Sequence, residues 1–433
     1  MTGILSSYFK KSKEEMADHA FLLALTLVIV SLPFSIRLNS ISIVLLIVCW
    51  GVQNNFSRLL QVVKSNRLFW FNISLYLLSV ISMLYTQNKH DGKFELEKEF
   101  SLLLFPILLA SAKLIPLERI IFILWSFVLA NFVLGALGIL YAVYGYWKYD
   151  LNYFFYHDLV RLFNFHATYF SMYLLFSIVI LVYLFIINKK EYGTILKSGI
   201  ILIITFFIVL IFLLSVRSII VFFCLSTLVS IIVYTIRMKN VKLGFLLLSG
   251  FITIVYFGIN KNEVLKDRLL QIKDNYKYEF SRGDTNIYNG FTTRLAQWEC
   301  SFIIIKKSPF FGVGIGDVQD ELQIQYKKNI LNYSFKGRFN AHNQYFQTGL
   351  GLGIVGLLIF MGGFVLALIL SYRQKNYVYL VFSILFYSCC LTESMLCMQQ
   401  GVVFYAFFNA LFTFHTFQRE ITIEAKDLSA KAE

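Results

Sequence analysis

Charged residues are scarce in this sequence. They make up 15% of it, against about 25% in an average soluble domain. Proline is also rare, with 4 residues in 433, whereas hydrophobic residues reach 58% and the mean hydropathy is +0.67. Water cannot accommodate that much apolar surface, whereas lipid can. The composition excludes an ordinary soluble domain and predicts an all-α integral membrane protein.

Paired cysteines and a basic stripe are missing as well. The 6 cysteines show no CxxC spacing, so we expect neither a disulfide framework nor a zinc site. The net charge of +14 does not indicate nucleic-acid binding, because the basic residues lie in short segments between apolar runs, without interleaved exposed aromatics. No Asp/Glu cluster resembles a divalent-metal site, and we expect no metal and no cofactor.

Apolar runs of about the twenty residues that span a bilayer recur along the chain. The first follows a mixed-charge stretch and lacks a small-residue cleavage site, so we interpret it as a span and not as a cleaved signal. The runs predict about twelve transmembrane helices, near 20–36, 39–53, 68–86, 100–115, 118–145, 166–187, 197–215, 217–236, 241–259, 343–372, 376–391 and 400–417.

The charges of the loops predict the orientation. With the N-terminus inside, the short cytoplasmic loops hold more Lys and Arg than the short outer loops. We therefore expect both termini in the cytoplasm and an even number of spans. Three regions follow: a nine-span membrane region at 1–259, a large outer loop at 260–342, and a three-span region with a cytoplasmic tail at 343–433.

The outer loop at 260–342 is too long to serve only as a connection between two spans. We expect three helices in it. The first is an amphipathic helix whose apolar residues recur at spacings of three and four, namely Leu265, Leu269, Ile272, Tyr276 and Phe280. The second runs from Thr293 to Lys307, where Ser308 and Pro309 end it, and the third begins at Asp317, an N-cap residue. No internal repeat is visible, which disfavours an inverted-repeat transporter.

Candidate functional residues follow in this loop. Arg294 and Trp298 lie four apart on one helical face, where the Arg could also simply stack on the Trp. The GVGIGD turn, with Gly312 and Gly314, either exposes N–H groups to a phosphate or is only a tight turn before a helix. His342, at the mouth of the tenth span, either accepts a proton from a hydroxyl or is a hydrogen-bonded interfacial histidine.

Further polar residues lie at the same predicted depth. Arg217 stands between two apolar runs, where an unpaired charge costs several kcal/mol, so it is a functional candidate. We expect five further residues at the same membrane–water boundary, on the extracytoplasmic side: Arg161, His166, Arg294, His342 and Glu393. Guanidinium groups suit a diphosphate, because they bind it bidentately and stay charged.

At these residues the sequence resembles the O-antigen ligase/polymerase family. The resemblance rests on Arg217, on R-x-x-x-W (Arg294, Trp298), on P-x-x-G-x-G (Pro309, Gly312, Gly314) and on His342 with Asn343, and it covers roughly 160–400. It implies a GT-C-like membrane enzyme of the bacterial inner membrane, active on the periplasmic side. It also implies a metal-independent, inverting transfer of glycan from undecaprenyl diphosphate.

The resemblance assigns roles to three residues. It implies that Arg217 and Arg294 hold the diphosphate and that His342 orients or deprotonates the attacking hydroxyl; topology adds Arg161, His166 and Glu393 as substrate-binding residues. The acceptor stays open between lipid A–core, which is our first choice, a second carrier-linked glycan in a polymerase, and a protein. A transporter or flippase of lipid-linked sugars is the alternative of another class. A purely structural scaffold would not need arginines at one depth.

Overall fold

The computed structural model describes residues 2–53, 55–113, 115–187, 192–274 and 290–430, and the regular elements in these ranges are all helical, as expected. The helices are α1 (Thr2–Ser31), α2 (Ile36–Val52), α3 (Phe56–Ser65), α4 (Arg67–Ser82), α5 (Lys89–Glu99), α6 (Ser101–Ser111), α7 (Leu117–Tyr149), α8 (Tyr156–Leu159), α9 (Ala167–Ile187), α10 (Thr194–Leu214), α11 (Arg217–Met238), α12 (Val241–Asn260), α13 (Glu263–Asp274), α14 (Gly290–Lys307), α15 (Val318–Lys328), α16 (Asn332–Lys336), α17 (Gln344–Arg373), α18 (Tyr377–Cys389) and α19 (Gln399–Ala430).

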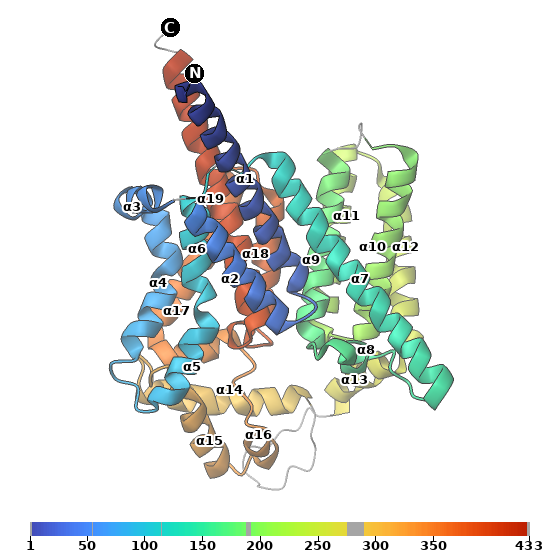
Figure 1. The fold of residues 1–433 in the computed structure, drawn as a ribbon. Coiled ribbons are helices and arrows are strands. Elements are labelled where there is room, and N and C mark those ends of the chain that lie inside the picture. The colour runs from blue at the N-terminus through green and yellow to red at the C-terminus, as the bar shows by residue number, and fades with distance from the viewer. Residues whose placement is uncertain (1, 54, 114, 188–191, 275–289, 431–433) are drawn as a thin grey trace.

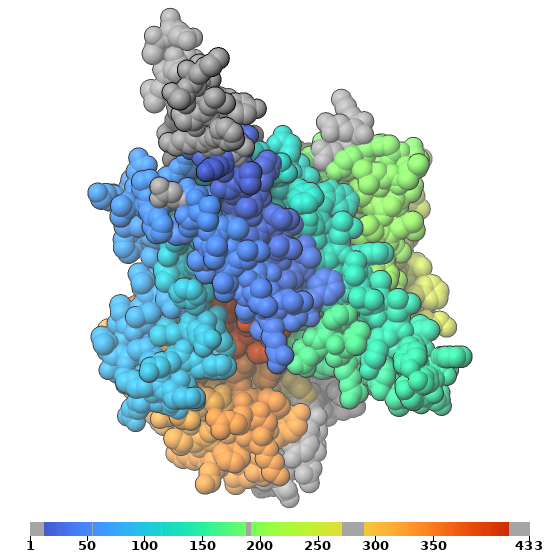
Figure 2. Space-filling model, viewed as in Figure 1, coloured from blue at the N-terminus to red at the C-terminus, as the bar shows by residue number. Residues whose placement is uncertain are grey.

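The long helices run alongside one another and form one bundle (Figure 1). The start of α1 and the end of α19 lie at one end of it, whereas α5 and α13 to α16 lie at the opposite end. In Figure 2 the residues of α14 to α16 (orange) form a protruding mass at that opposite end. This arrangement agrees with an even number of crossings. The side of the membrane and the three-region division stay predictions.

Six helices in the described part of the chain are long and apolar enough to cross a bilayer: α7, α9, α10, α11, α12 and α17. The bent pair of α2 and α3 makes a seventh if it is counted as one span, and the apolar helices α4 and α18 are shorter. Helix α6 has 11 residues, and α1 and α19 continue from apolar stretches into polar ends. Each predicted apolar run therefore coincides with a helix, but the number of about twelve spans stays a prediction.

Aromatic rings fill the centre of the bundle, where α7, α9, α18 and α19 meet. The ring centroids of Phe176 and Phe408 lie 4.9 Å apart, and those of Tyr173 and Phe404 lie 4.7 Å apart. Phe382 of α18 adds a third contact, 5.2 Å from Phe176. Lipid is as apolar as these side chains, so helices in a membrane associate through such packing contacts. These packing contacts hold the helices in place, and with them the turns at the ends of the helices.

Helix α17 is interrupted near its start at Gly353, which has φ +62°. A Cβ at Gly353 would come within 2.3 Å of a backbone oxygen, so only glycine fits there. The glycine-rich turn that precedes α15 lies in the break: the Val313 N–H donates to the Leu350 carbonyl, and the Ile354 N–H donates to the Pro309 carbonyl, each at 2.8 Å. The outer segment is thereby fastened to the membrane helix.

The three helices expected in the loop at 260–342 correspond to α13, α14 and α15. Leu265 of the predicted apolar stripe is buried at 1% exposure, whereas Tyr276 and Phe280 lie outside the described residues. The second helix begins at Gly290, three residues before the expected Thr293. The described parts of the loop therefore contain helices at the three places that the pattern indicated.

Asp317 has a different role from the side-chain cap that the sequence indicated. It occupies the N-cap position of α15, but its side chain makes no capping hydrogen bond there. Its carboxylate instead accepts the N–H groups of Gln87 and Asn88, at 2.8 and 2.7 Å. The two donors stand just before α5, so Asp317 ties the outer loop to an earlier turn. A partner so distant in sequence is invisible to a local capping pattern.

Candidate functional site

His342 and Glu393 form the centre of the candidate site. The two side chains meet through His342 Nδ1 and Glu393 Oε1, 2.9 Å apart, and Arg294 Nη2 lies 3.7 Å from Glu393 Oε2. The Glu393 side chain is only 7% exposed. Burial raises the pKa of Glu393, but the hydrogen bond and charge of His342, with the charges of His166 and Arg294, outweigh it and lower the pKa to about 2. The carboxylate is therefore ionised at neutral pH.

The turn before α17 places His342 against the turn that follows α18. His342 has a left-handed backbone, φ +44°, and its N–H donates to Asn340 Oδ1 at 2.9 Å. Asn343 caps α17 with its side-chain oxygen, as an N-cap residue does, and donates through Nδ2 to the Leu391 carbonyl at 3.0 Å. The Asn343 N–H donates to Ser394 Oγ at 3.2 Å. Asn343 thus joins the segments that carry the histidine and the glutamate.

Arg294 projects from α14 toward this pair. Its side chain is 29% exposed, and the contact with Glu393 holds one side of its guanidinium. Trp298, one turn further on, stacks on Phe346 of α17, with centroids 6.0 Å apart, so its ring packs against the membrane helix. The indole Nε1 is buried and has no hydrogen-bond partner among the described residues. The ring anchors the helix that carries Arg294.

A second arginine pair lies beside the first group. Arg217 begins α11, and its Nη1 donates to the carbonyl oxygen of Arg268, on α13, at 3.0 Å. A Cβ added at Gly290 would lie 3.4 Å from Arg217 Nη2, so the start of α14 also touches this guanidinium. The Arg268 guanidinium lies over the Tyr156 ring, 3.9 Å from its centroid. Helices α8, α11, α13 and α14 therefore meet at two cationic side chains.

Among the described residues, the three guanidinium groups have too little negative charge beside them to balance their own charge. Arg217 experiences the positive charges of both Arg268 and Arg294. Glu393 is the carboxylate that pairs with Arg294, and Arg268 Nη1 is buried without a hydrogen-bond partner among the described residues. Converging guanidinium groups with free N–H donors suit a multiply charged oxyanion. In the described residues no three His, Cys, Asp or Glu side chains are placed to hold a metal ion.

Two histidines border the arginines. The rings of His157 and His166 lie 4.5 Å apart, edge to face, and the ring of Tyr156 lies 3.9 Å from that of His157. Burial, together with the nearby charges of His166 and Arg268, lowers the pKa of His157 to about 4. His157 is therefore neutral at pH 7, and its Nδ1 accepts the Ala167 N–H at 3.3 Å.

Three predicted site residues are placed differently from the rest. Arg161 is exposed, and its Nη1 lies 3.9 Å from Asp158 Oδ1. The Gly314 N–H donates to the Gly351 carbonyl at 3.1 Å, and Gly312, with φ +71°, fits where a Cβ would strike the backbone of α17. The N–H groups of this turn are used inside the protein, so we leave Gly312 and Gly314 out of the proposed site. We leave Arg161 out because its described ion pair is with Asp158.

Sequence reasoning missed Arg268 and His157 as neighbours of the site. Arg268 lies on the amphipathic helix that the spacing indicated, three residues after the buried Leu265. An arginine beside the apolar stripe of a helix at the predicted outer boundary was the available signal. His157 stands in the short segment before His166 and could have been paired with it. The sequence cannot tell which side of α13 faces α8.

The apolar helices define the chain as a multi-pass, helical membrane protein. Residues 201–361 match the family model of the O-Antigen ligases, which confirms the resemblance expected from the sequence. The match supports a relationship to the O-antigen ligase/polymerase family of membrane glycosyltransferases over that part of the chain. It includes Arg217, Arg268, Arg294 and His342. No curated protein matches the chain.

Proposed function

We propose that the protein is an O-antigen ligase-type glycosyltransferase of the bacterial inner membrane. It moves a glycan from undecaprenyl diphosphate to an acceptor hydroxyl at the periplasmic face, with lipid A–core as the first candidate acceptor. The observation that carries this proposal is the meeting of three arginines with a histidine–carboxylate pair. The arginines suit a diphosphate leaving group, and the histidine–carboxylate pair suits the removal of a proton from a hydroxyl.

The hydrogen bond between His342 and Glu393 fixes the roles of the two ring nitrogens. Glu393 accepts the proton on Nδ1, so Nε2 of the neutral ring keeps its lone pair and serves as the base. The acceptor oxygen attacks the anomeric carbon and its proton passes to Nε2. The bond from that carbon to the diphosphate oxygen breaks, and the diphosphate leaves with the electron pair. Attack opposite the leaving group inverts the anomeric configuration.

The arginines stabilise the departing diphosphate. Negative charge on the bridging oxygen grows as the glycosidic bond breaks, and preorganised cations at that point lower the barrier. The family resemblance implies this role for Arg217 and Arg294, and the position of Arg268 beside Arg217 adds a third guanidinium. No metal is needed in this scheme, because the guanidinium groups carry the countercharge.

A polymerase or a protein O-oligosaccharyltransferase would use the same chemistry with another acceptor. These are alternatives within the family, and the contacts around His342 do not separate them. A flippase of lipid-linked sugars is the alternative of another class. It would have no use for a histidine hydrogen-bonded to a buried glutamate beside the arginines, which favours the enzyme.

The proposal is tested with purified protein, carrier-linked glycan and lipid A–core. His342→Ala should lower turnover by roughly 10²–10⁴, the scale of a positioned acid–base group, while donor affinity stays near wild type. EDTA should leave the wild-type rate unchanged. His90→Ala is the matched control, because His90 is exposed on α5. Normal turnover of folded His342→Ala, or a strict need for added metal, would contradict the mechanism.

A further inference from the structure

An exposed aromatic surface lies where α14 ends, at the same end of the bundle as the candidate site (Figure 1). Phe310 and Phe311 follow α14 and are 67% and 60% exposed, and Leu84, which follows α4, is 84% exposed. The Tyr85 hydroxyl donates to the Phe311 carbonyl at 2.7 Å, so the two segments meet here. Large apolar side chains gathered on a surface indicate contact with another molecule. The surface, here called the aromatic rim, consists of Leu84, Tyr85, Phe302, Phe310 and Phe311.

The aromatic rim continues the outward-facing apolar surface of two membrane helices. The Val355 N–H of α17 donates to the Phe310 carbonyl at 3.3 Å. From there, exposed apolar residues follow α17 at spacings of three and four, which places them on one face: Ile354, Leu358, Met361, Val365 and Ile369. Exposed Val80 and Ile81 of α4 lead to Leu84 in the same way. Because α17 is apolar enough to span a bilayer, its exposed stripe faces acyl chains, and the rim lies where that stripe ends.

Two lysines stand next to the rim. Lys306 and Lys307 end α14, and both are exposed. Lys306 Nζ lies over the Phe302 ring, 4.5 Å from its centroid. The ion pairs among the described residues use neither lysine, and Glu299, two turns before Lys306, is the acidic residue of this helix. Aromatic rings at the end of an apolar surface, with lysines beyond them, are typical of the membrane–water interface.

The direction of α14 links this surface to the candidate site. Figure 1 shows α14 lying across the end of the bundle, crosswise to the long helices. When the long helices cross a bilayer, a crosswise helix lies along the plane of that bilayer, and its residues share one depth. Arg294 precedes Phe302 on this helix by about 12 Å of axial rise. A Phe302 ring at headgroup level therefore keeps Arg294 at the level of the lipid phosphates.

We propose that the aromatic rim lies in the headgroup region of the bilayer and binds phospholipids there, with Lys306 and Lys307 beside the lipid phosphates. The continuous apolar surface of α4 and α17 favours the surrounding bilayer over a second copy of the chain as the occupant. The lipid contact holds α14, and with it Arg294, at the depth where a lipid-linked diphosphate presents its charges. Only this last step rests on the proposed function.

The test measures the depth of the aromatic rim in the full chain, reconstituted in phospholipid nanodiscs after replacement of the six native cysteines. A nitroxide spin label is attached at Phe310→Cys. Its collisions with oxygen, which dissolves in lipid, are compared with its collisions with a water-soluble nickel chelate. Leu358→Cys, on the exposed stripe of α17, is the reference for lipid, and Lys328→Cys, exposed on α15, is the reference for water. The oxygen-to-nickel ratio at Phe310→Cys should lie between the two references.

The lysines are tested with the label kept at Phe310→Cys. Lys306→Glu combined with Lys307→Glu reverses two charges beside the lipid phosphates, so the oxygen-to-nickel ratio should shift toward the water reference, because like charges repel. Lys327→Glu combined with Lys328→Glu is the matched control, since this exposed pair ends α15 as the other pair ends α14. The control should leave the ratio at Phe310→Cys unchanged.

The outcomes separate the bilayer from other surroundings of the rim. A ratio between the references, lowered by the double change in α14 alone, supports the proposal. A ratio equal to the water reference, rare collisions with both reagents, as under protein or a second copy of the chain, or equal ratios in the two double variants would overturn it. If Phe310→Cys does not fold, Leu84→Cys carries the label, since Leu84 is the most exposed residue of the rim. The label reports depth and not transfer, so an inactive protein whose rim lies in lipid would refute the proposed function and leave this lipid contact standing.

Discussion

The imidazole of His342 and the carboxylate of Glu393 are held 2.9 Å apart, although 51 residues separate them in the chain. The other oxygen of the same carboxylate lies near Arg294. One buried acidic group thus links the proposed base to the arginines that face the leaving group. This linkage makes Glu393 the position where a small chemical change should have the clearest effect.

Glu393→Gln should lower turnover by about 10²-fold, the lower end of the range for an acid–base group. The amide NH₂ can donate to Nδ1 of His342, which would put the ring proton on Nε2 and remove the lone pair that takes the acceptor proton. Glu393→Asp keeps the charge and should recover part of the rate. Steady-state kinetics with saturating donor measures this effect. A rate for Glu393→Gln equal to that of wild type would mean that the carboxylate does not set the tautomer.

The stability of the fold should depend on pH through Glu393. Its pKa is lowered from 4.5 to about 2, so the folded protein gains stability from the ionised carboxylate above pH 4.5 and loses it as the pH falls toward 2. Other acids titrate in the same window, so the informative quantity is the difference between wild type and Glu393→Gln. Thermal unfolding at pH 5 and pH 3 should show a larger drop for wild type. Equal drops would show that folding does not lower the pKa of Glu393.

Arg268→Ala should weaken donor binding by about tenfold to a hundredfold, because a hydrogen-bonded charge pair is typically worth 1.5–3 kcal/mol. Arg268→Lys should restore little, since one ammonium cannot reproduce the guanidinium fork. Lys266→Ala is the matched control on the same helix, where Lys266 is exposed. Titration of each variant with a carrier-linked diphosphate glycan gives the affinity. Equal affinity for Arg268→Ala and Lys266→Ala would leave Arg268 a packing residue over Tyr156.

Much of the site could be predicted because the apolar runs of a membrane protein show at which depth in the bilayer each polar residue lies. Apolar runs located the helices, and their ends placed Arg217, Arg294, His342 and Glu393 at one boundary, where the structure brings them together. Depth alone does not fix position around the bundle. Arg161 shares the depth but points to Asp158.

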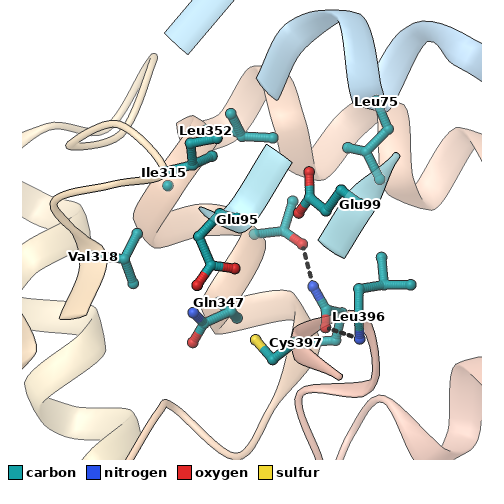
Figure 3. Close-up of a pocket in the computed structure, with 12 residues that line it drawn as sticks. Leu75, Glu95, Glu99, Ile315, Val318, Gln347, Leu352, Leu396 and Cys397 are labelled. Atoms are coloured by element: carbon teal, nitrogen blue, oxygen red, sulfur yellow. Dashed lines mark hydrogen bonds between the residues drawn. The ribbon is translucent and has the colours of Figure 1, made fainter. Parts of the chain in front are cut away.

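The remaining features depend on contacts between segments far apart in the chain. The N–H of Gly314 is taken by the carbonyl of Gly351, in a break of α17 that no local pattern shows. No local pattern shows that Glu95 and Glu99 of α5 line a small pocket together with Gln347 and Thr348 of α17 (Figure 3).

The orientation in the membrane gives the last prediction. The turn between α11 and α12, with exposed Lys239, lies at the end of the bundle where the chain termini are, and α15, with exposed Lys328, lies at the other. If the arginine cluster works in the periplasm, Lys328→Cys should react with a membrane-impermeant maleimide in cells whose outer membrane is permeabilised. Lys239→Cys should react only after lysis.

The background for this labelling needs all six native cysteines replaced, because each is free in the structure. Labelling of Lys239→Cys with protection of Lys328→Cys would place His342 and the arginines on the cytoplasmic side. A periplasmic transfer from the carrier would then be impossible, whatever the fold resembles.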